Sequence, residues 1–370
     1  MSKLINKEDK RFVTFIVCLI CIPLILILLL IVAQSCARKK ETKTSYVSYE
    51  EKMENAAIKY LSDIDQVPYE EGDYIIVQLD TLVEQSYINS TEKALKDSTC
   101  SGQVVARKGY TVNYIPYLEC KNYKTQTLKN SIMGELTKDS DGLYETADGY
   151  VFRGLAVNNF VEITGVEYRI ISMDKNGIVK LYNRVSETDN MYWDRKYNVA
   201  TQNYAGLNIY GDSYIVERMY HSYLFDERYE AAKTVMVPVD VCVYSKDLNN
   251  RFLDKSSCAQ VAEKQYITLL GLDDYMNASL DKNCVDLYSK SCVNYNYLDR
   301  VTGVNTWTKD VVSNNSYQAY RIIDGVAYAE NIDTAASYNH VIYIDGNELI
   351  YSGNGSKEKP YTIKKYWQNI

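Results

Sequence analysis

The most apolar part of the chain is a 21-residue stretch without charge, from Phe12 to Val32. A stretch of this length spans the hydrocarbon core of a bilayer as one helix. Pro23 lies within it, and membrane helices tolerate proline better than soluble helices do. The stretch is also longer than the apolar core of a signal peptide. We therefore predict a cytoplasmic tail over residues 1–11 and a transmembrane helix over 12–33, with the lipid bilayer as a partner.

The residues that follow the span leave a second interpretation open. Residues 33–36 read Ala-Gln-Ser-Cys, which resembles a poor lipoprotein cleavage site. In that case the apolar stretch is removed and Cys36 carries the lipid. Both interpretations place the chain at a membrane.

A small α+β unit is predicted over residues 34–125. Apolar side chains recur at three- and four-residue steps over 44–63, which indicates an amphipathic helix. Pro68 and Gly72 end this pattern. A strand over 73–79, a short helix over 80–87 and a hairpin over 102–115 follow. We interpret the first helix as a stalk and the rest as a headpiece.

A larger, β-rich α+β unit is predicted over residues 149–370, after a polar linker over 126–148. Short apolar runs separated by Asn and Gly turns indicate a β-meander from residue 150 to 182. The other predicted elements are a helix over 212–232, a strand over 267–270, a short helix near Asp273, and strands over 319–323, 340–344 and 361–364.

The cysteines indicate on which side of the membrane these units lie. Lys and Arg are equally frequent on the two sides of the span, so the positive-inside rule gives no orientation. Beyond Cys36, six cysteines form three closely spaced pairs, and none belongs to a CxxC motif. Such pairs are typical of disulfides in an oxidising compartment. We therefore predict an extracellular C-terminal part of a single-pass cell-membrane protein, although free thiols in a cytosolic domain are the alternative. The predicted bridges are Cys100–Cys120, Cys242–Cys258 and Cys284–Cys292.

Composition excludes one class of partner. Residues 44–370 carry 33 Lys and Arg against 45 Asp and Glu, so the chain lacks the basic surface that nucleic-acid binding requires. Of 45 aromatic residues 36 are Tyr, which suits both sheets and binding surfaces. The chain has two histidines, and we expect no metal and no cofactor. Oligomeric state does not follow from composition.

The first unit resembles the headpiece of pilin-like exported proteins. The resemblance covers residues 45–125 and rests on Ala-Ala-Ile-Lys-Tyr at 56–60, Leu-Asp-Thr-Leu at 79–82, Ser-Tyr-Ile at 86–88, and a cysteine-bracketed hairpin that ends in Tyr-Leu-Glu-Cys at 117–120. It implies a structural role in an assembly. The Gly-Phe-Thr-Leu-Ile-Glu processing sequence of pilins is missing before the span, which puts pilin maturation in doubt.

The second unit resembles an uncharacterised C-terminal module of exported proteins from low-GC Gram-positive bacteria. The resemblance rests on Tyr-Val-Phe-Arg-Gly at 150–154, Asn-Asn-Phe-Val at 158–161, Glu-Tyr-Arg-Ile-Ile at 167–171, Val-Lys-Leu at 179–181, Ile-Thr-Leu-Leu at 267–270, Cys-Val-Asn-Tyr-Asn-Tyr-Leu at 292–298, Trp-Thr at 307–308, Ser-Gly-Asn-Gly at 352–355 and Pro-Tyr-Thr-Ile at 360–363. That family is similar to the C-type-lectin-like and formylglycine-generating-enzyme-like fold, which implies a lectin-like module. The calcium-binding motifs of sugar-binding lectins do not carry over, since the chain reads Trp-Thr-Lys-Asp at 307–310.

No motif for catalysis is present in the sequence, so we expect a binding or adhesion protein with an unknown glycan or peptide ligand. The nucleophile elbow, the phosphate-binding loop and the HExxH motif are missing. Both His221 and His340 fall on predicted regular elements. Carboxylates from distant positions leave an envelope hydrolase open as an alternative, and a structural assembly component is another. The candidate ligand-binding residues are Trp193, Asp194, Arg195 and Trp307, with burial of both tryptophans in the core as the competing interpretation.

Overall fold

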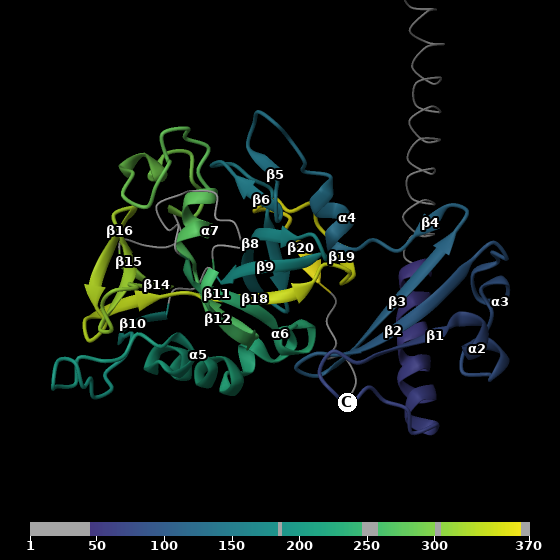
Figure 1. The fold of residues 1–370 in the computed structure, drawn as a ribbon. Helices are drawn as coiled ribbons and strands as arrows, with labels where there is room; N and C mark the ends of the chain where they lie inside the picture. The colour runs from purple at the N-terminus through teal and green to yellow at the C-terminus, as the bar shows by residue number, and fades with distance from the viewer. Residues whose placement is uncertain (1–44, 184–186, 246–257, 300–304, 364–370) are drawn as a thin grey trace, which may run out of the picture.

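The chain folds into two α+β units with separate hydrophobic cores. A computed structural model describes residues 45–183, 187–245, 258–299 and 305–363 (Figure 1). Within these ranges the chain is rich in strands, which confirms the predicted α+β class. Among the described residues we find no helix with the length and apolarity needed to cross a bilayer, and the predicted span 12–33 and Cys36 lie outside these ranges.

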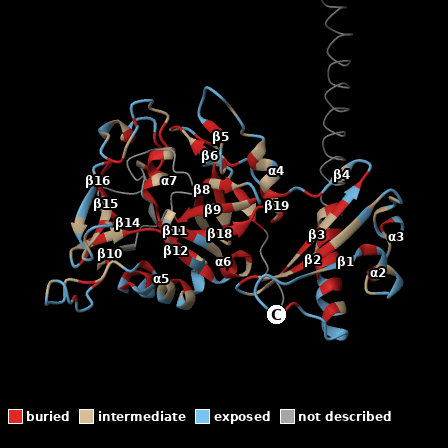
Figure 2. Ribbon diagram, in the orientation of Figure 1, coloured by how far each residue is buried: buried red, intermediate tan, exposed pale blue. Residues whose placement is uncertain are grey.

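The headpiece includes the first helix, because residues 45–63 pack against a four-stranded antiparallel sheet instead of standing apart as the predicted stalk. The buried positions of this helix include Tyr49, Met53 and Ala57, and their three- and four-residue spacing puts them on the face that meets the sheet (Figure 2). The other elements are β1 (Tyr74–Gln78), α2 (Leu79–Glu84), α3 (Thr91–Leu95), β2 (Ser101–Lys108), β3 (Val112–Cys120) and β4 (Tyr123–Lys124). The predicted helix, strand and hairpin are therefore confirmed.

The module is built on a nine-stranded sheet. Its main path runs β13-β18-β9-β8-β7-β20-β19, and the β5–β6 pair joins it through β8. All pairs are antiparallel except β20 with β7. The strands are β5 (Gly142–Thr146), β6 (Gly149–Arg153), β7 (Phe160–Ile163), β8 (Val166–Asp174), β9 (Ile178–Asn183), β13 (Ile267–Leu269), β18 (His340–Asp345), β19 (Ile350–Ser352) and β20 (Tyr361–Ile363). The predicted strands between 150 and 182 are present.

A second sheet and a two-stranded ribbon complete the module. The second sheet has the order β10-β17-β14-β15-β16, and the ribbon pairs β11 with β12. These strands are β10 (Glu187–Tyr192), β11 (Val239–Ser245), β12 (Cys258–Gln265), β14 (Asn305–Val311), β15 (Gln318–Ile323), β16 (Val326–Asn331) and β17 (Ala335–Tyr338). The sequence pattern predicted only β15 among them.

The helices of the module are short. They are α4 (Leu128–Met133), α5 (Tyr214–Phe225), α6 (Glu230–Val235) and α7 (Leu272–Asn277). The helix predicted over 212–232 is interrupted, because Asp226 leaves the helical conformation and its side chain accepts the Arg228 amide at 2.9 Å. Ser213 caps the start of α5 by accepting a hydrogen bond from Val216 N.

The segment 126–148, predicted as a linker, differs from the expectation. Most of it belongs to the module, because it forms α4 and β5 and places Leu128, Ile132 and Leu143 in the module's core. An α4 of six residues is too short to produce a clear helical period in a polar segment. The boundary between the units therefore lies near Thr125.

Candidate functional site

A hollow of about 500 Å³ opens on the surface of the module, beside the loop between α7 and β14. It is lined by Leu155, Asp281, Val293, Asn294, Tyr295, Asn296 and Asp299. Most of these residues come from one short segment, 293–299, and the lining combines an aromatic ring, two carboxylates and two amides. Concave sites with a few converging polar groups are where small ligands bind.

The wall of the hollow is held rigid from within. The Cys284–Cys292 disulfide closes the loop, and the buried Asn296 side chain fixes the next turn. Its amide nitrogen donates to Tyr275 O at 2.9 Å and Cys292 O at 2.8 Å, while its oxygen accepts from Leu298 N at 2.9 Å. Because both polar atoms of the buried Asn296 side chain are hydrogen-bonded to the backbone, this residue shapes the site rather than binding a ligand.

Tyr295 is the most unusual residue of this wall. Its φ is +48°, a left-handed conformation that costs about 1–2 kcal/mol for most L-residues and that Gly and Asn adopt more readily. Its side chain is 63% exposed, so burial does not compensate for this backbone strain. Strain of this kind is concentrated at functional sites. The conformation presents an aromatic ring at the edge of a polar hollow.

Two carboxylates of the hollow are already hydrogen-bonded within the protein. Asp281 accepts from Asn294 Nδ2 at 2.7 Å and from Asn283 N at 2.8 Å. Asp299 accepts from the Tyr275 hydroxyl at 2.7 Å. Burial, followed by the hydrogen bond to Asp299, raises the pKa of Tyr275, which keeps this hydroxyl a donor. A carboxylate accepts several hydrogen bonds, so Asp299 can also accept from the hydroxyl groups of a ligand.

The β15–β16 turn supports the hollow from behind. Gly325 in this turn has a φ of +77°, and a Cβ at this position would come within 1.9 Å of Val293 Cγ1 and 3.3 Å of Asp299 Oδ1. Glycine is therefore required there both by the backbone conformation and by the close approach of the site wall. The positions of Val293 and Asp299 in the wall of the hollow therefore depend on a glycine in a separate turn, at residue 325.

The structure buries both tryptophans that the sequence suggested as stacking platforms. Trp193 and Trp307 are each 0% exposed, and their indole N–H groups donate to Thr308 O at 3.1 Å and Met191 O at 3.0 Å. Neither ring offers a face to a ligand. The competing interpretation, in which both are core residues, describes their position in the structure.

The residues that follow Trp193 have different environments. Asp194 is buried and accepts the amides of Leu207 and Tyr214, so it organises the loop behind it. Arg195 is exposed, with its guanidinium 4.4 Å from the centre of the Tyr192 ring. The exposed aromatic residues of this stretch are instead Tyr197 and Tyr204, whose rings meet edge to face at 5.5 Å. They lie outside the lining of the hollow.

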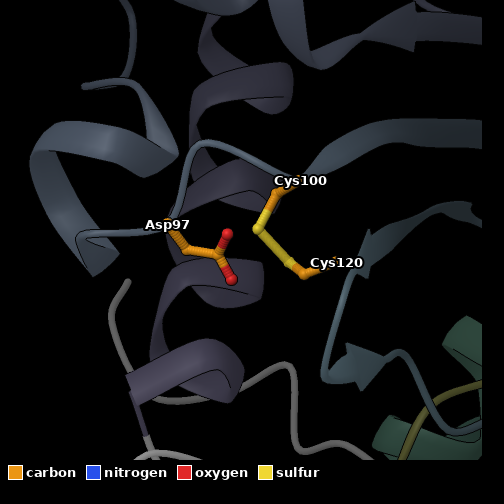
Figure 3. A group of neighbouring side chains, drawn as sticks. All are labelled: Asp97, Cys100 and Cys120. Carbon is orange, nitrogen blue, oxygen red and sulfur yellow. A yellow bond between two sulfur atoms is a disulfide. The ribbon is translucent and has the colours of Figure 1, made fainter.

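All three predicted disulfides are present, each between nearest neighbours in sequence. Cys100–Cys120 clamps the open end of the β2–β3 hairpin, and Asp97 lies beside it (Figure 3). These three residues are the one convergent group of possible metal ligands among the described residues. However, the sulfurs are bonded to each other, and the Asp97 carboxylate accepts from the Tyr46 hydroxyl at 2.7 Å. We assign no metal to this group.

The two histidines lie in contrasting environments. His340 begins β18 and is 0% exposed, with Tyr223 and Tyr338 edge to face against its ring. Burial, with a smaller effect of the Arg228 charge, lowers the pKa of His340 to about 3. His221 is exposed on α5, with its ring 4.6 Å from that of Phe225. Neither histidine lines the hollow.

A buried network of charges lies in the module's core. Lys180 on β9 contacts both carboxylate oxygens of Asp274 at 2.7 and 2.6 Å, and Lys309 contacts Asp310 at 3.1 Å and Asp273 at 3.5 Å. Burial opposes the charge on Lys180, but the field of Asp274 outweighs it and raises its pKa. The network joins β9, α7 and β14, so its role is to hold these elements together.

The comparisons with known proteins leave the assignment to the structure itself. No protein-family model, no curated protein and no solved structure matches this chain.

The sequence did contain a signal for the hollow, because Tyr295 lies between two asparagines just after Cys292. Asn is frequent in turns, so an aromatic residue between two asparagines indicates an aromatic side chain on a loop.

Proposed function

We propose that this chain is a membrane-anchored cell-surface protein that binds an extracellular glycan in the hollow around Tyr295. The observation that carries the proposal is the strained, exposed Tyr295 ring beside the polar side chains of Asp281, Asn294 and Asp299. A sugar presents an apolar ring face, which stacks on an aromatic side chain, and hydroxyl groups, which bond to carboxylates and amides. The resemblance to lectin-like modules is consistent with this ligand class.

The proposed location rests on the predicted span 12–33 and on the disulfides. Three bridges stabilise the two units, and such bridges form in oxidising compartments. A cell-surface location exposes the hollow to envelope or host polysaccharides. The proposal therefore joins a membrane anchor, a disulfide-stabilised ectodomain and one polymer-binding surface.

The exposed face of the 45–63 helix gives little support to the pilin-like assembly role. Its exposed positions are mostly polar, and include Ser48, Lys52 and Asn55, with Ile58 as an isolated apolar residue. An envelope hydrolase is the second candidate, because Asp281 and Asp299 line the same hollow. Most glycosidases use a pair of carboxylates for catalysis.

A glycan array with the full chain, followed by titration of the best ligand, tests the proposal. We expect Tyr295→Asn to weaken binding by about 1–3 kcal/mol, as removal of an aromatic anchor does. The same change should leave stability unchanged or raise it by up to about 1 kcal/mol, because Asn adopts a left-handed φ more readily than Tyr. Isothermal calorimetry and thermal unfolding measure the two quantities on the same sample.

Tyr288→Asn is the matched control. Tyr288 is 58% exposed on the neighbouring loop closed by the Cys284–Cys292 disulfide, but it does not line the hollow, so its loss should leave affinity unchanged. Equal affinity of wild type and Tyr295→Asn would exclude the hollow as the binding site. Release of new reducing ends from the bound glycan, lost in Asp299→Asn, would favour the hydrolase instead.

A further inference from the structure

The headpiece meets the module at more than one place. At the β2–β3 turn, Tyr110 N donates to Met236 O at 3.5 Å and the Tyr110 ring lies edge to face with that of Tyr266. The more buried contact is made by the turn after β18. Residues 346–349, between β18 and β19, lie against β3 of the headpiece, because Asn113 and Tyr117 of β3 hydrogen-bond to Glu348 and Asn347. Arg107 pairs with Asn113 across the β2–β3 hairpin, and Arg107 Nη1 contacts Asp345 Oδ2 at 2.5 Å. The hydroxyl of Tyr117, four residues further along β3 and on the same face, donates to Asn347 O at 3.4 Å.

Glu348 is the residue of this turn that enters the joint most deeply. Its side chain is 0% exposed, and Asn113 Nδ2 donates a hydrogen bond to its Oε1. The other two oxygens of the pair, Glu348 Oε2 and Asn113 Oδ1, have no hydrogen-bond partner among the described residues. Both are acceptors if Glu348 is ionised, and an unsatisfied buried acceptor is destabilising.

The charges around Glu348 do not favour its ionised form. Asp345 approaches from the end of β18 and Glu54 from the 45–63 helix, while Arg107 approaches from β2. Burial, followed by the two carboxylates, raises the pKa of Glu348 well above its usual value, and Asn113 and Arg107 only partly oppose this shift. The nearby Glu50 is also buried and accepts from the Tyr123 and Thr125 hydroxyls.

We propose that a proton closes this joint: the Glu348 carboxyl is protonated when headpiece and module are docked, and it releases that proton when they separate. In the docked form the Oε2 hydroxyl donates to Asn113 Oδ1, while Oε1 accepts from Asn113 Nδ2. One proton thus satisfies both orphaned acceptors. On separation the proton passes to water and leaves a hydrated carboxylate, so the angle between the two units becomes sensitive to pH.

A bound cation is a weaker explanation of the same cluster. Among the described residues no three carboxylate, imidazole or thiol groups converge at the joint closely enough to hold a metal ion. The two unsatisfied atoms belong to side chains that one hydrogen bond already joins. A proton therefore completes the geometry that is present.

The direction of the pH effect follows from proton linkage. The docked form holds a proton that a separated Glu348 loses above its usual pKa of 4.5. Docking is therefore strongest below this pH and weakens as pH rises toward the raised pKa. Over that interval each pH unit favours separation by about tenfold.

Hydrogen exchange of the full chain from pH 5 to 8.5 tests the proposal, with Glu348→Gln as the central variant. The Gln side chain imitates the protonated acid, since its amide donates to Asn113 Oδ1 and its oxygen accepts from Nδ2. The reporters are the amide of Tyr110, which donates to Met236 O across the joint, and the amides of Leu128 and Ile350, which donate to Glu348 O and Gln126 O on the module side of it. After correction for intrinsic exchange, we expect these amides to lose protection about tenfold per pH unit in wild type and not in Glu348→Gln.

Glu358→Gln, at an exposed glutamate of the same unit, should behave as wild type. Parallel pH profiles for wild type and Glu348→Gln, or weaker protection of the variant at neutral pH, would overturn the proposal. Protection that depends on added Ca²⁺ and is lost with EDTA would also overturn it. If the variant does not fold, the infrared carbonyl band of a protonated carboxyl decides on wild type alone. Its absence at neutral pH in the docked protein contradicts a protonated Glu348.

Discussion

The core of the module and the joint between the units both bury several carboxylates, and they balance them differently. In the core, Lys180 and Lys309 lie among Asp273, Asp274 and Asp310. In the joint, the carboxylates of Glu50, Glu54, Asp345 and Glu348 are buried, and the partly exposed Arg107 pairs with Asp345. A buried carboxylate is stabilised by a paired cation, by hydrogen bonds to its ionised form or by a proton. The core therefore uses permanent ion pairs, whereas the joint is left to respond to pH.

The largest effect should come from breaking a core ion pair on one side. Lys180→Met leaves Asp274 without its cation in a buried site, which costs about 3–5 kcal/mol of unfolding free energy. The double variant Lys180→Met/Asp274→Leu should recover much of this loss, because it removes both charges. Urea unfolding measures both values.

Lys175→Met is the control for this comparison, since Lys175 is exposed in the turn before β9. Its effect should stay within about 0.5 kcal/mol. An equally small loss for Lys180→Met would show that the core pair carries no more stability than a surface charge, and would remove the contrast with the joint.

The second effect concerns His340, a buried ionisable group. Its contribution to stability depends on pH with the opposite sign to that of Glu348. Its folded pKa of about 3 lies below its usual value of 6.5, so its neutral form is favoured in the folded state. Stability is complete above pH 6.5 and falls as pH decreases toward 3, by about 1.4 kcal/mol per unit. We expect His340→Leu to lose less stability than wild type between pH 6.5 and 4.5.

His221→Leu, at the exposed histidine of α5, should retain the acid dependence of wild type. Thermal unfolding of the three proteins across this pH range gives the difference curves. Identical slopes for His340→Leu and wild type would show that His340 binds a proton equally well in the folded and the unfolded chain, contrary to its buried aromatic surroundings.

The sequence predicts best those features that are determined by residues close together along the chain. The strands β6 to β9 were predictable, because alternating side chains and Asn or Gly turns are local signals. β14 was missed, because the alternation is replaced by buried polar residues, including Thr306, Thr308 and Lys309, whose partners lie on other elements. The disulfides were predictable because each joins the nearest cysteine in the sequence.

The sites depend on longer distances still. Whether Trp193 is a platform or a core residue is decided by Thr308, 115 positions away, which accepts its indole hydrogen. The Asn113–Glu348 contact spans 235 positions and has no local pattern. Tyr295 is intermediate, since its asparagine neighbours mark a turn while the hollow needs residues as distant as Leu155. Local chemistry thus identifies candidate residues, and only the fold shows which of them meet.

The smallest effect tests the cation of the joint. Arg107 is partly exposed, so its pairing with Asp345 is screened by water, and Arg107→Gln should cost only about 1 kcal/mol. The informative result is the pH dependence, because without the guanidinium the remaining carboxylates hold the Glu348 proton more tightly. We therefore expect the joint amides of Arg107→Gln to keep their protection to a higher pH than in wild type.

Lys124→Gln removes the exposed pair with Glu119 in the same unit and should change neither quantity measurably. A shift of the profile to lower pH in Arg107→Gln would mean that the joint depends on the Arg107–Asp345 pair itself, and that it resembles the ion-paired core more than a proton-held contact.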